Sequence, residues 1–371
     1  MAEVAVQKNP ASGGSSDTDT KLPITMATGA PSTTAVTTVT QVGTWPMTLR
    51  KWRGSIASAS LMMSTLIDPA AAPNVLPMNT TLPGIGVSLS STHRTNAVSL
   101  MIERAQVAHA AGLGSLTIGD HHDMKVPYAQ NTPMLGRLLA EWVGRPAGCL
   151  FLTPLWKPLL MAEHIGTLAA MHHAASPGVP FIVQTGIGWG DAQFTNLGAD
   201  MSRRGRDIDA VIPIVKALLA GEAVTDNYFG LAEATVGLRS DGPIEWWIGG
   251  TADVAIDRAA RLGDCWYGSP GQDDESIRRG VERYRAAGGS RFALRRDAVL
   301  GPDARATQSL ARDLTERGYR GLPFERLLSG SANELGERLG ELRELGVDDV
   351  IVRCASPDQA GAITTLQELG R

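Results

Sequence analysis

The sequence predicts an α/β protein whose main domain is a (β/α)₈ barrel, or TIM barrel, with one insertion and a disordered N-terminal leader. From about residue 83 to residue 367, short apolar segments of strand length alternate with segments of helical periodicity. The strand count is near eight over roughly 290 residues, which suits a closed barrel. A doubly wound open sheet is the alternative, but the first strand leads into residues 88–91, Ser-Leu-Ser-Ser, and not into the expected G-x-G-x-x-G.

Residues 1–80 are rich in Ser, Thr, Ala and Pro and show no sustained period of 3.6 or 2. Such a segment cannot bury enough apolar surface to offset the entropy of ordering, so we expect a disordered leader. A basic segment at 48–53, an apolar one at 56–67 and small residues at 70–72 imitate a secretion signal. Serines dilute the apolar part, which favours an unstructured leader or a misplaced start codon, with Met78 as a natural alternative start.

The barrel elements follow in order after the leader. Apolar runs predict strands at residues 85–89, 116–118, 148–152, 181–183, 244–248, 265–267 and 350–352. Helical spacing predicts helices from Asn96 to Gly112 and at residues 133–143, 158–170, 206–220 and 252–262. A capping box at residues 331–334 opens a last predicted helix, which Gly346 ends. The looser stretch 221–241 is the expected insertion.

Composition excludes several classes of protein. The chain has 371 residues, 43% of them hydrophobic, and a net charge of −4, which argues against a nucleic-acid-binding surface. The three cysteines, Cys149, Cys265 and Cys354, form no CxxC pair, so we expect buried thiols in a reducing compartment and neither a zinc site nor a disulfide framework. No run approaches the roughly 20 apolar residues of a membrane span. We therefore expect a cytoplasmic protein without a membrane partner.

Sites in such barrels form from the loops that follow the strands, and Asp120, His121 and His122 come directly after the second strand. Two imidazoles beside a carboxylate suit proton transfer near neutral pH. Neighbouring histidines in an extended segment point to opposite sides, so one metal ion would rarely bind both, and we predict no metal site. These three residues are the predicted catalytic group.

Two further strand ends predict walls of a pocket for a flat ring. After the third strand, residues 153–158 place Trp156 between two prolines, with Thr153 and Leu155 as candidate contacts, although a plain turn into the helix would look the same. After the fourth strand, glycines let a ligand approach the backbone closely. The candidates in this second loop are Thr185, Gly186, Gly188 and Trp189.

The fourth strand end is Gly249-Gly250-Thr251, which enters a helix. Free amides at a helix start bind phosphate, and glycine removes steric obstruction. Thr251 adds a hydroxyl donor. An ordinary N-cap is the alternative interpretation, and the position late in the barrel favours a phosphate site.

Taken in order, these motifs resemble those of the luciferase-like monooxygenase family. The matching residues are 110–113, 120–122, 154–158, 162–163, 186–189, 194, 197–198, 203–206, 247–251, 258–264 and 346–350. The resemblance implies a barrel that binds FMN or the deazaflavin coenzyme F-420 at the strand ends. It places His121 or His122 beside the ring, the phosphate near Gly249, Gly250 and Thr251, and a non-prolyl cis peptide at Leu155.

Ile187 departs from the family pattern, because it falls where luciferases carry an arginine for the FMN phosphate. This departure raises the deazaflavin alternative. The segment 177–180, which replaces the usual Gly-Arg, changes the entry of the fourth strand.

The leading hypothesis is a flavin-dependent oxidoreductase that acts on a small organic substrate with reduced FMN and O₂, or exchanges a hydride with it. The alternatives are a deazaflavin-dependent hydride-transfer enzyme, a non-catalytic flavin-binding accessory subunit and a metal-dependent hydrolase. A separate flavin reductase would supply reduced cofactor, since no second dinucleotide motif is present, and a homodimer is left open. Specificity is expected from Tyr228 and Phe229 in the insertion and from the loop 124–132.

Overall fold

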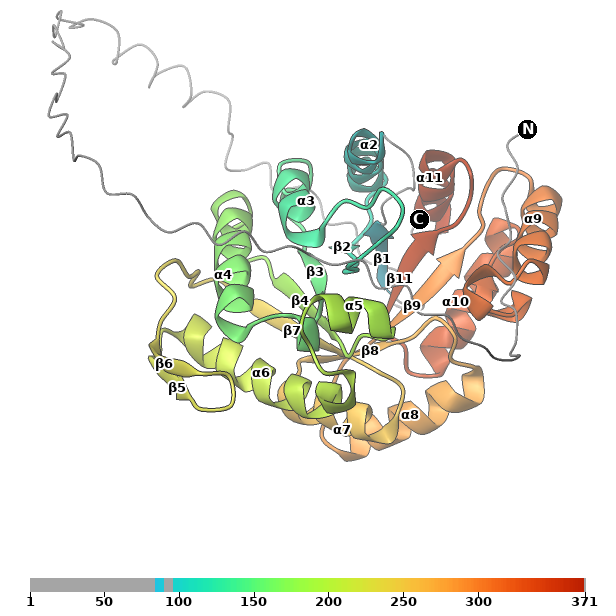
Figure 1. The fold of residues 1–371 in the computed structure, drawn as a ribbon. Coiled ribbons are helices and arrows are strands. Elements are labelled where there is room, and N and C mark those ends of the chain that lie inside the picture. Colours follow the sequence, from blue (N-terminus) through green and yellow to red (C-terminus); the bar gives the residue numbers. More distant parts are fainter. Residues whose placement is uncertain (1–83, 90–95, 370–371) are drawn as a thin grey trace, which may run out of the picture. The chain divides into compact units, whose positions relative to one another are not determined.

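The computed structural model describes residues 84–89 and 96–369, and these residues contain a closed barrel of eight parallel strands with helices around it (Figure 1). The barrel strands are β1 (Gly84–Leu89), β2 (Leu116–Ile118), β3 (Ala147–Leu152), β4 (Phe181–Gly186), β7 (Ile244–Gly249), β8 (Cys265–Gly268), β9 (Phe292–Ala298) and β11 (Asp349–Cys354). Each strand pairs with the next, and β11 pairs with β1, so the sheet closes. The leader predicted at residues 1–80 lies outside the described residues.

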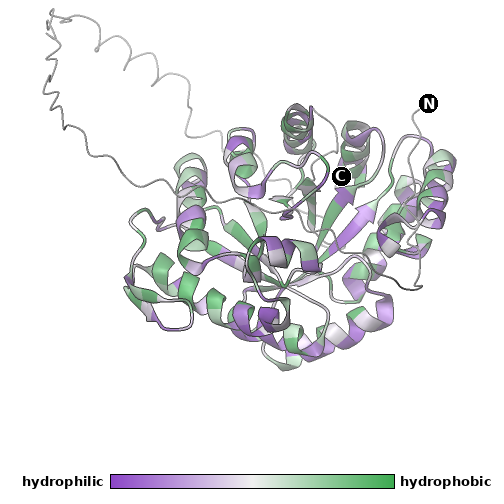
Figure 2. Ribbon diagram, viewed as in Figure 1, coloured by the Kyte–Doolittle hydropathy of each residue, from purple (hydrophilic) through white to green (hydrophobic). Residues whose placement is uncertain are grey.

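Helices cover the outside of this barrel. They are α2 (Ala97–Ala110), α3 (Asn131–Leu138), α4 (Pro158–Ala175), α6 (Arg204–Ala220), α7 (Asp253–Leu262), α8 (Asp274–Ala286), α9 (Ala304–Glu316), α10 (Ala332–Glu344) and α11 (Gln359–Leu369). The short helix α5 (Asp191–Asn196) lies instead in the loop after β4, at the mouth of the barrel. In Figure 2 the helices around the barrel carry both hydrophobic and hydrophilic residues, and each has buried residues that pack against the barrel. No helix in the described part of the chain is long and apolar enough to cross a membrane.

Strand alternation divides the core into two parts. Outward-facing strand residues pack against the helices in the main cluster, which includes Val183, Leu294 and Val352. Inward-facing residues fill the barrel interior, in a small cluster of Ile182, Trp247, Cys265, Ala293 and Ile351. The barrel is therefore a packed core, and these inward residues tell which other residues of each strand face the interior.

All seven strands expected from the sequence are present, and the fold prediction is confirmed. The insertion contains a small antiparallel hairpin of β5 (Val224–Asp226) and β6 (Leu231–Ala234). The predicted capping box forms, since Ser331 Oγ accepts from the Glu334 amide and the Glu334 carboxylate accepts from the Ser331 amide. The helix expected at 133–143 was misplaced, because the chain turns after Leu138 and Trp142 Nε1 donates to Pro146 O.

The eighth barrel strand, β9, was not recognised in the sequence. Its sequence, FALRRDA, has two arginines and an aspartate where a buried strand normally has apolar residues, and it is drawn partly in purple in Figure 2. The carboxyl end of β9, at Asp297 and Ala298, also pairs in parallel with a separate short strand that follows α9, β10 (Leu327–Leu328). A charged segment inside the barrel thus marks β9 as different from the other strands.

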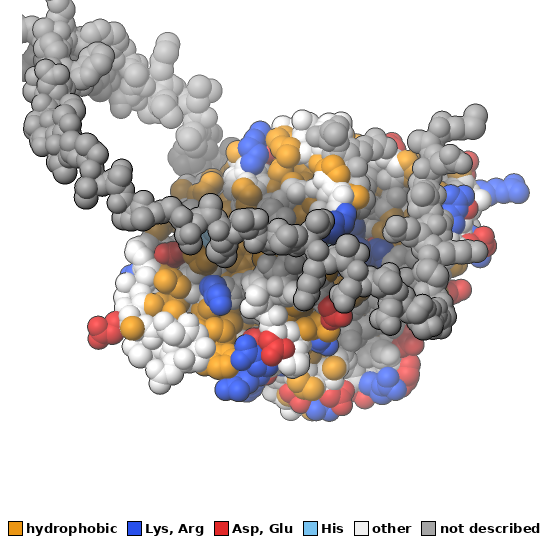
Figure 3. Space-filling view, in the orientation of Figure 1, with side chains coloured by type: hydrophobic (Ala, Val, Ile, Leu, Met, Phe, Trp, Pro, Cys, Tyr) orange, Lys and Arg blue, Asp and Glu red, His pale blue; other side chains and the backbone are white. Residues whose placement is uncertain are grey.

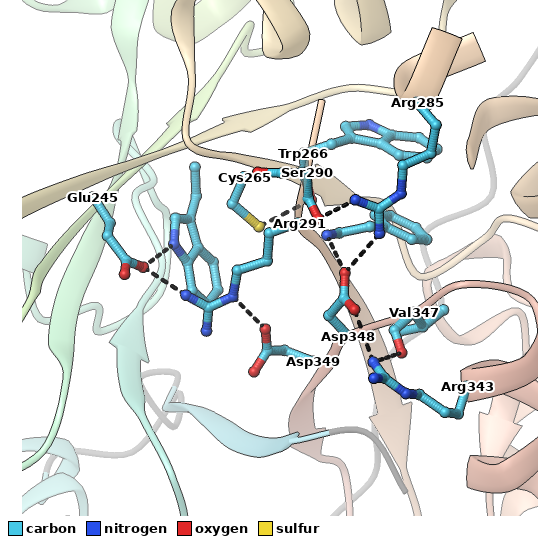
Figure 4. A network of polar contacts seen from close by, with 12 residues as sticks. Glu245, Cys265, Trp266, Arg285, Ser290, Arg291, Arg343, Val347, Asp348 and Asp349 are labelled. Carbon is cyan, nitrogen blue, oxygen red and sulfur yellow. Dashed lines mark hydrogen bonds and ion pairs between the residues drawn. The ribbon is translucent and has the colours of Figure 1, made fainter. Parts of the chain in front are cut away.

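The amino end of the barrel is closed by ion pairs, which Figure 4 shows from close by. Arg291 precedes β9 and binds Glu245 of β7 (Nη1 to Oε2, 2.9 Å) and Asp349 of β11 (Nε to Oδ2, 2.7 Å). The indole of Trp247 donates to Glu245 Oε2, and the guanidinium lies 5.4 Å from the centre of that ring. These contacts tie three strands together below the apolar interior.

Candidate active site

Asp120 is the buried centre of the candidate site at the carboxyl end of the barrel. It follows β2, and its side chain is fully buried. Its Oδ2 accepts hydrogen bonds from the Leu152 amide (2.8 Å) and from Trp156 Nε1 (2.9 Å), so it joins the end of β2 to the loop after β3. Two donors on one oxygen hold the carboxylate in place and leave Oδ1 for the neighbouring imidazole.

His122 is that neighbour. Its Nε2 lies 3.2 Å from Asp120 Oδ1, close enough for an ion pair when the ring is protonated, although the angles are not those of a standard hydrogen bond. The edge of the imidazole meets Trp156, with 6.0 Å between ring centres, and the His122 amide donates to Gln193 Oε1 at 3.4 Å. Asp120, Trp156 and α5 therefore fix this histidine together.

His121 lies differently and is half-buried against Tyr128, with 6.1 Å between the ring centres. Burial lowers the pKa of His121 below its ordinary value of 6.5. The negative charge of Asp120 opposes this shift, whereas the charges of His122 and Arg320 add to it. Its imidazole is thus mainly neutral at pH 7 and able to accept a proton.

The two histidines have separate partners, as strand geometry predicts. Among the described residues, no group of three or more His, Cys, Asp and Glu side chains is arranged to hold a metal ion. The chemistry that this arrangement can perform is therefore proton transfer by His121, beside an imidazole that Asp120 holds.

The loop after β3 provides an aromatic wall through Trp156. This side chain contacts Asp120 and His122, and its ring also meets Phe151 and His164. Thr153 is fully buried and donates to Phe151 O (3.3 Å), while Leu155 is half-buried. The expectation of a cis peptide at Leu155 was wrong, since none occurs within residues 84–89 and 96–369. The loop turns instead through a 3₁₀ segment, Thr153–Leu155, with trans peptides.

The loop after β4 divides its predicted residues between two environments. Thr185 is fully buried, and because Ile182 faces the interior, strand alternation turns Thr185 toward the helices and away from the mouth. Gly186 ends the strand on its inward face. Gly188 has φ +71° and lies against the Phe194 ring, where a Cβ would come within 3.1 Å. Trp189 is 78% exposed, so its indole is an open edge of the mouth.

The backbone around Gly250 departs from the expectation of free amides. The Gly250 amide donates to Tyr267 O (3.3 Å), which continues the pairing of β7 with β8, and is not available to a phosphate. A Cβ on Gly249 would come within 2.4 Å of Thr185 O, so this glycine serves the close approach of β4 and β7. The amides left for a ligand are those of the first turn of α7, beyond Thr251.

A cavity of about 680 Å³ opens beside Thr251, between the starts of α7 and α8. The hydroxyls of Thr251, Ser269 and Ser276 line it. So do Arg279 and Arg283, of which Arg283 is bound to Asp253 and Asp257. Acidic and basic side chains intermix along the lower edge of the molecule in Figure 3, where Figure 1 places α7 and α8. The hydroxyls and Arg279 fit the anionic tail of a cofactor, and apart from Thr251 the sequence did not indicate them.

The opposite side of the mouth carries a charged cluster that was also missed. It consists of Arg295, Asp297, Tyr319, Arg320 and Arg353, from β9, β11 and the 3₁₀ turn Tyr319–Gly321. The Arg-Arg-Asp run between apolar neighbours was the available signal, but alternation along an unrecognised strand could not be applied to it.

A barrel with its polar residues gathered at the carboxyl ends of the strands has the construction of the α/β-barrel enzymes. The family model described as luciferase-like monooxygenase matches residues 81–360, and the chain belongs to this family. Among curated proteins it is 29% identical over 200 residues to an uncharacterized protein of Mycobacterium tuberculosis, and 28% identical over 189 residues to an F420-dependent glucose-6-phosphate dehydrogenase of Microbacterium testaceum. Each match covers 47% of this chain, with 66% and 54% of those proteins, less than two thirds of either length.

Solved structures share the fold. An F420-dependent secondary alcohol dehydrogenase in complex with an F420-acetone adduct superposes with a TM-score of 0.65 at 16% identity, covering 78% of this chain and 98% of that one. The monooxygenase RslO1 from Streptomyces bottropensis gives 0.64 at 16% identity, covering 76% and 97%. The neighbours therefore include F420-dependent enzymes as well as monooxygenases.

Proposed function

We propose that the protein is an oxidoreductase that exchanges a hydride between a small organic substrate and a deazaflavin coenzyme bound across the mouth of the barrel. The observation that carries the proposal is the position of His121, which is half-buried with a pKa lowered by that burial, beside the connected group of Asp120, His122 and Trp156. An F420-dependent dehydrogenase among the relatives and an F420-dependent alcohol dehydrogenase among the similar folds support the choice of cofactor.

The residues present fit such a cofactor. Trp156 gives one flat wall, and the loop after β4 offers Ile187, Gly188 and Trp189 without a basic side chain. The tail would lie in the cavity beside Thr251, with Arg279 as its cation and the first turn of α7 as a source of amides. The bound coenzyme supplies a ring carbon that takes up or gives back a hydride.

His121 moves the proton in this scheme. When an alcohol is oxidised, the carbon loses a hydride to the coenzyme and the hydroxyl loses a proton, which the neutral imidazole of His121 accepts. Asp120 holds His122 and Trp156, and their rings exclude water from one side of the site. In the reverse direction His121 returns the proton to the carbonyl oxygen.

Cofactor titration tests the proposal. The purified protein is titrated with the deazaflavin coenzyme and with FMN, each oxidised and reduced, and binding is followed by cofactor fluorescence. We expect saturable binding of the deazaflavin and weaker binding of FMN. If neither cofactor binds in either redox state, the proposal is wrong.

A His121→Ala variant tests the catalytic role. Turnover of alcohols from a panel, followed by deazaflavin absorbance, should fall by about 10²- to 10⁴-fold while coenzyme binding is kept. His109→Ala is the matched control, because His109 lies on α2 and contacts Val143 O outside the mouth. Unchanged turnover in His121→Ala would instead favour a non-catalytic, accessory role.

A second candidate is an FMN-dependent monooxygenase that uses reduced flavin from a separate reductase and O₂. The pair of adjacent imidazoles after Asp120 favours it, since one histidine could hold a proton near the ring while the other stays bound to the carboxylate. Oxygen consumption in the presence of reduced FMN, with FMN binding tighter than deazaflavin, would select this candidate over the first.

A further inference from the structure

Strand β9 carries charge into the barrel on its inward face. Ala293 belongs to the interior cluster, so Arg295 and Asp297, two and four residues later, face the same way. Arg296 faces outward and donates to Pro270 O (3.0 Å) and Gln272 O (2.9 Å). Arg295 therefore points into the mouth of the barrel, whereas Arg296 joins β9 to the segment after β8 on the outside.

Arg353 reaches the same place from the adjacent strand. Ile351 of β11 lies in the interior cluster, so Arg353 also faces inward, and in the register of the two strands it lies opposite Asp297. Tyr319 and Arg320 arrive from the turn after α9, where Arg320 has φ +52° between two glycines with positive φ. This backbone conformation is uncommon for an arginine and brings its side chain to Asp297.

Asp297 is fully buried and already occupied. Its Oδ1 lies 3.2 Å from Arg295 Nε and Nη2, and its Oδ2 accepts from the Tyr319 hydroxyl (3.0 Å) and lies 3.3 Å from Arg320 Nε. The side chain of Arg353 forms no hydrogen bond or ion pair with any residue in 84–89 or 96–369, whereas its backbone lies in the ladder between β11 and β9. Among the described residues of this cluster, two guanidinium groups thus share the Asp297 carboxylate, and Arg353 adds a third positive charge without a carboxylate of its own.

This excess is unfavourable in the protein alone. Burial lowers the pKa of Arg320, and the charges of Arg353 and Arg295 lower it further, which is the effect of like charges held together. Arg295 Nη2 is buried without a hydrogen bond to the described residues, although Asp297 Oδ1 is within ion-pair distance. A bound anion would relieve both features.

The cluster faces the candidate catalytic group across the mouth. The charge of Arg320 lowers the pKa of His121, and the charge of Arg353 acts on the hydroxyl of Tyr128, the aromatic neighbour of His121. The two walls therefore share one space. None of the cluster's residues lines the cavity beside Thr251, whose lining comes from the loops after β7 and β8 and from α7 and α8.

We propose that Arg353, with Arg295 and Arg320, binds a carboxylate or phosphate group of the substrate and so directs the reacting carbon toward His121. Guanidinium groups match the planar or tetrahedral oxygens of such groups through paired hydrogen bonds. The proposal rests on the proposed function for its catalytic meaning, but the binding of the anion does not depend on a cofactor. In this proposal the arginines recognise the charged oxygens of the substrate and not its carbon skeleton.

Isothermal titration of the full-length protein without cofactor tests it, with benzoate and inorganic phosphate as anionic probes and benzyl alcohol as the neutral match of benzoate. We expect at least one of the anions to bind, more tightly than benzyl alcohol and more weakly as salt is added. Arg353→Gln should weaken that binding at least tenfold, and Arg353→Lys should restore part of it. Arg305→Gln, at an exposed position on α9, is the control and should bind as the original chain does.

Three outcomes overturn the proposal: no anion binds, benzyl alcohol binds as tightly as benzoate, or Arg353→Gln binds the anion normally. A fourth outcome would show that the cluster binds the phosphate of the cofactor and not an anion of the substrate. If Arg353→Gln weakens FMN but not riboflavin, the cluster holds the cofactor phosphate instead. Thermal melts of each variant show that it is folded. Because no cofactor is present in the anion titrations, failure of hydride transfer would leave their result unchanged.

Discussion

The two ends of the barrel hold their partly exposed arginines in opposite electrostatic environments. At the amino end, Arg291 has two carboxylates of its own, Glu245 and Asp349 (Figure 4). Burial acts to lower the pKa of Arg291, but the hydrogen bond and charge of Asp349, with Glu245, raise it overall. At the carboxyl end, Arg320 has a lowered pKa, from burial and from its arginine neighbours. The positive charge is therefore neutralised at the amino end, where ion pairs join the strands, and is in excess at the carboxyl end, where a ligand would enter.

The first prediction concerns stability and removes Arg291, the cation that two carboxylates neutralise at the amino end. Arg291→Met removes the cation between Glu245 and Asp349 and leaves Asp349 without this partner in a half-buried place. We expect the free energy of unfolding at pH 7 to fall by about 2 kcal/mol, less than for a fully buried pair because solvent reaches these side chains. Urea denaturation measures it.

Arg278→Met is the matched control, since Arg278 pairs with Glu275 on an exposed face of α8 and should change the unfolding free energy by less than about 0.5 kcal/mol. Equal losses in the two variants would show that the ion pairs at the amino end add nothing special to stability.

A second prediction concerns the pH dependence of stability, which a buried histidine of α4 should cause. His172, at the end of α4 before β4, is 1% exposed, and burial together with the neighbouring His173 lowers its pKa to about 4. The unfolded chain binds this proton at pH 6.5 and below, so stability should be unaffected above pH 6.5 and should fall as the pH drops toward 4. The loss due to this group reaches about 3 kcal/mol by the pH of its folded-state pKa.

Urea unfolding measured between pH 4 and pH 7 checks the effect of His172. His172→Gln keeps a donor for Val179 O, which His172 Nε2 contacts at 3.2 Å, and should flatten the pH dependence. A variant with the same slope as the original chain would assign the acid lability to other groups.

The sequence predicted the apolar strands of the barrel better than the charged residues of β9 and β11 at its mouth. The seven apolar strands and the position of Asp120-His121-His122 after β2 followed from local patterns, which act over few residues. Strand β9 did not, because Arg295 and Asp297 break the apolar pattern for a reason that lies in tertiary structure, namely neighbours on β11 and in the turn after α9. The Gly250 amide was likewise assigned to a ligand, whereas its acceptor is Tyr267 O on the next strand.

The smallest effect is also the most direct test of the link between the two walls. Arg320→Gln removes a positive charge that lowers the pKa of His121, so this pKa should rise toward its ordinary value of 6.5. Neutral His121 is the proton acceptor in the proposed reaction. The acid limb of kcat for alcohol oxidation should therefore move to a higher pH in the variant, whatever its rate at high pH, since Arg320 also belongs to the proposed anion site.

The pH dependence of kcat, measured for Arg320→Gln and for the control Arg305→Gln, separates a field effect from general damage to the site. A lower rate at every pH, without displacement of the acid limb, would mean that Arg320 does not act on His121. An acid limb that moves in the expected direction would join the arginine cluster and the histidine in one mouth, because a charge influences a titrating group only over short distances in a partly solvated site.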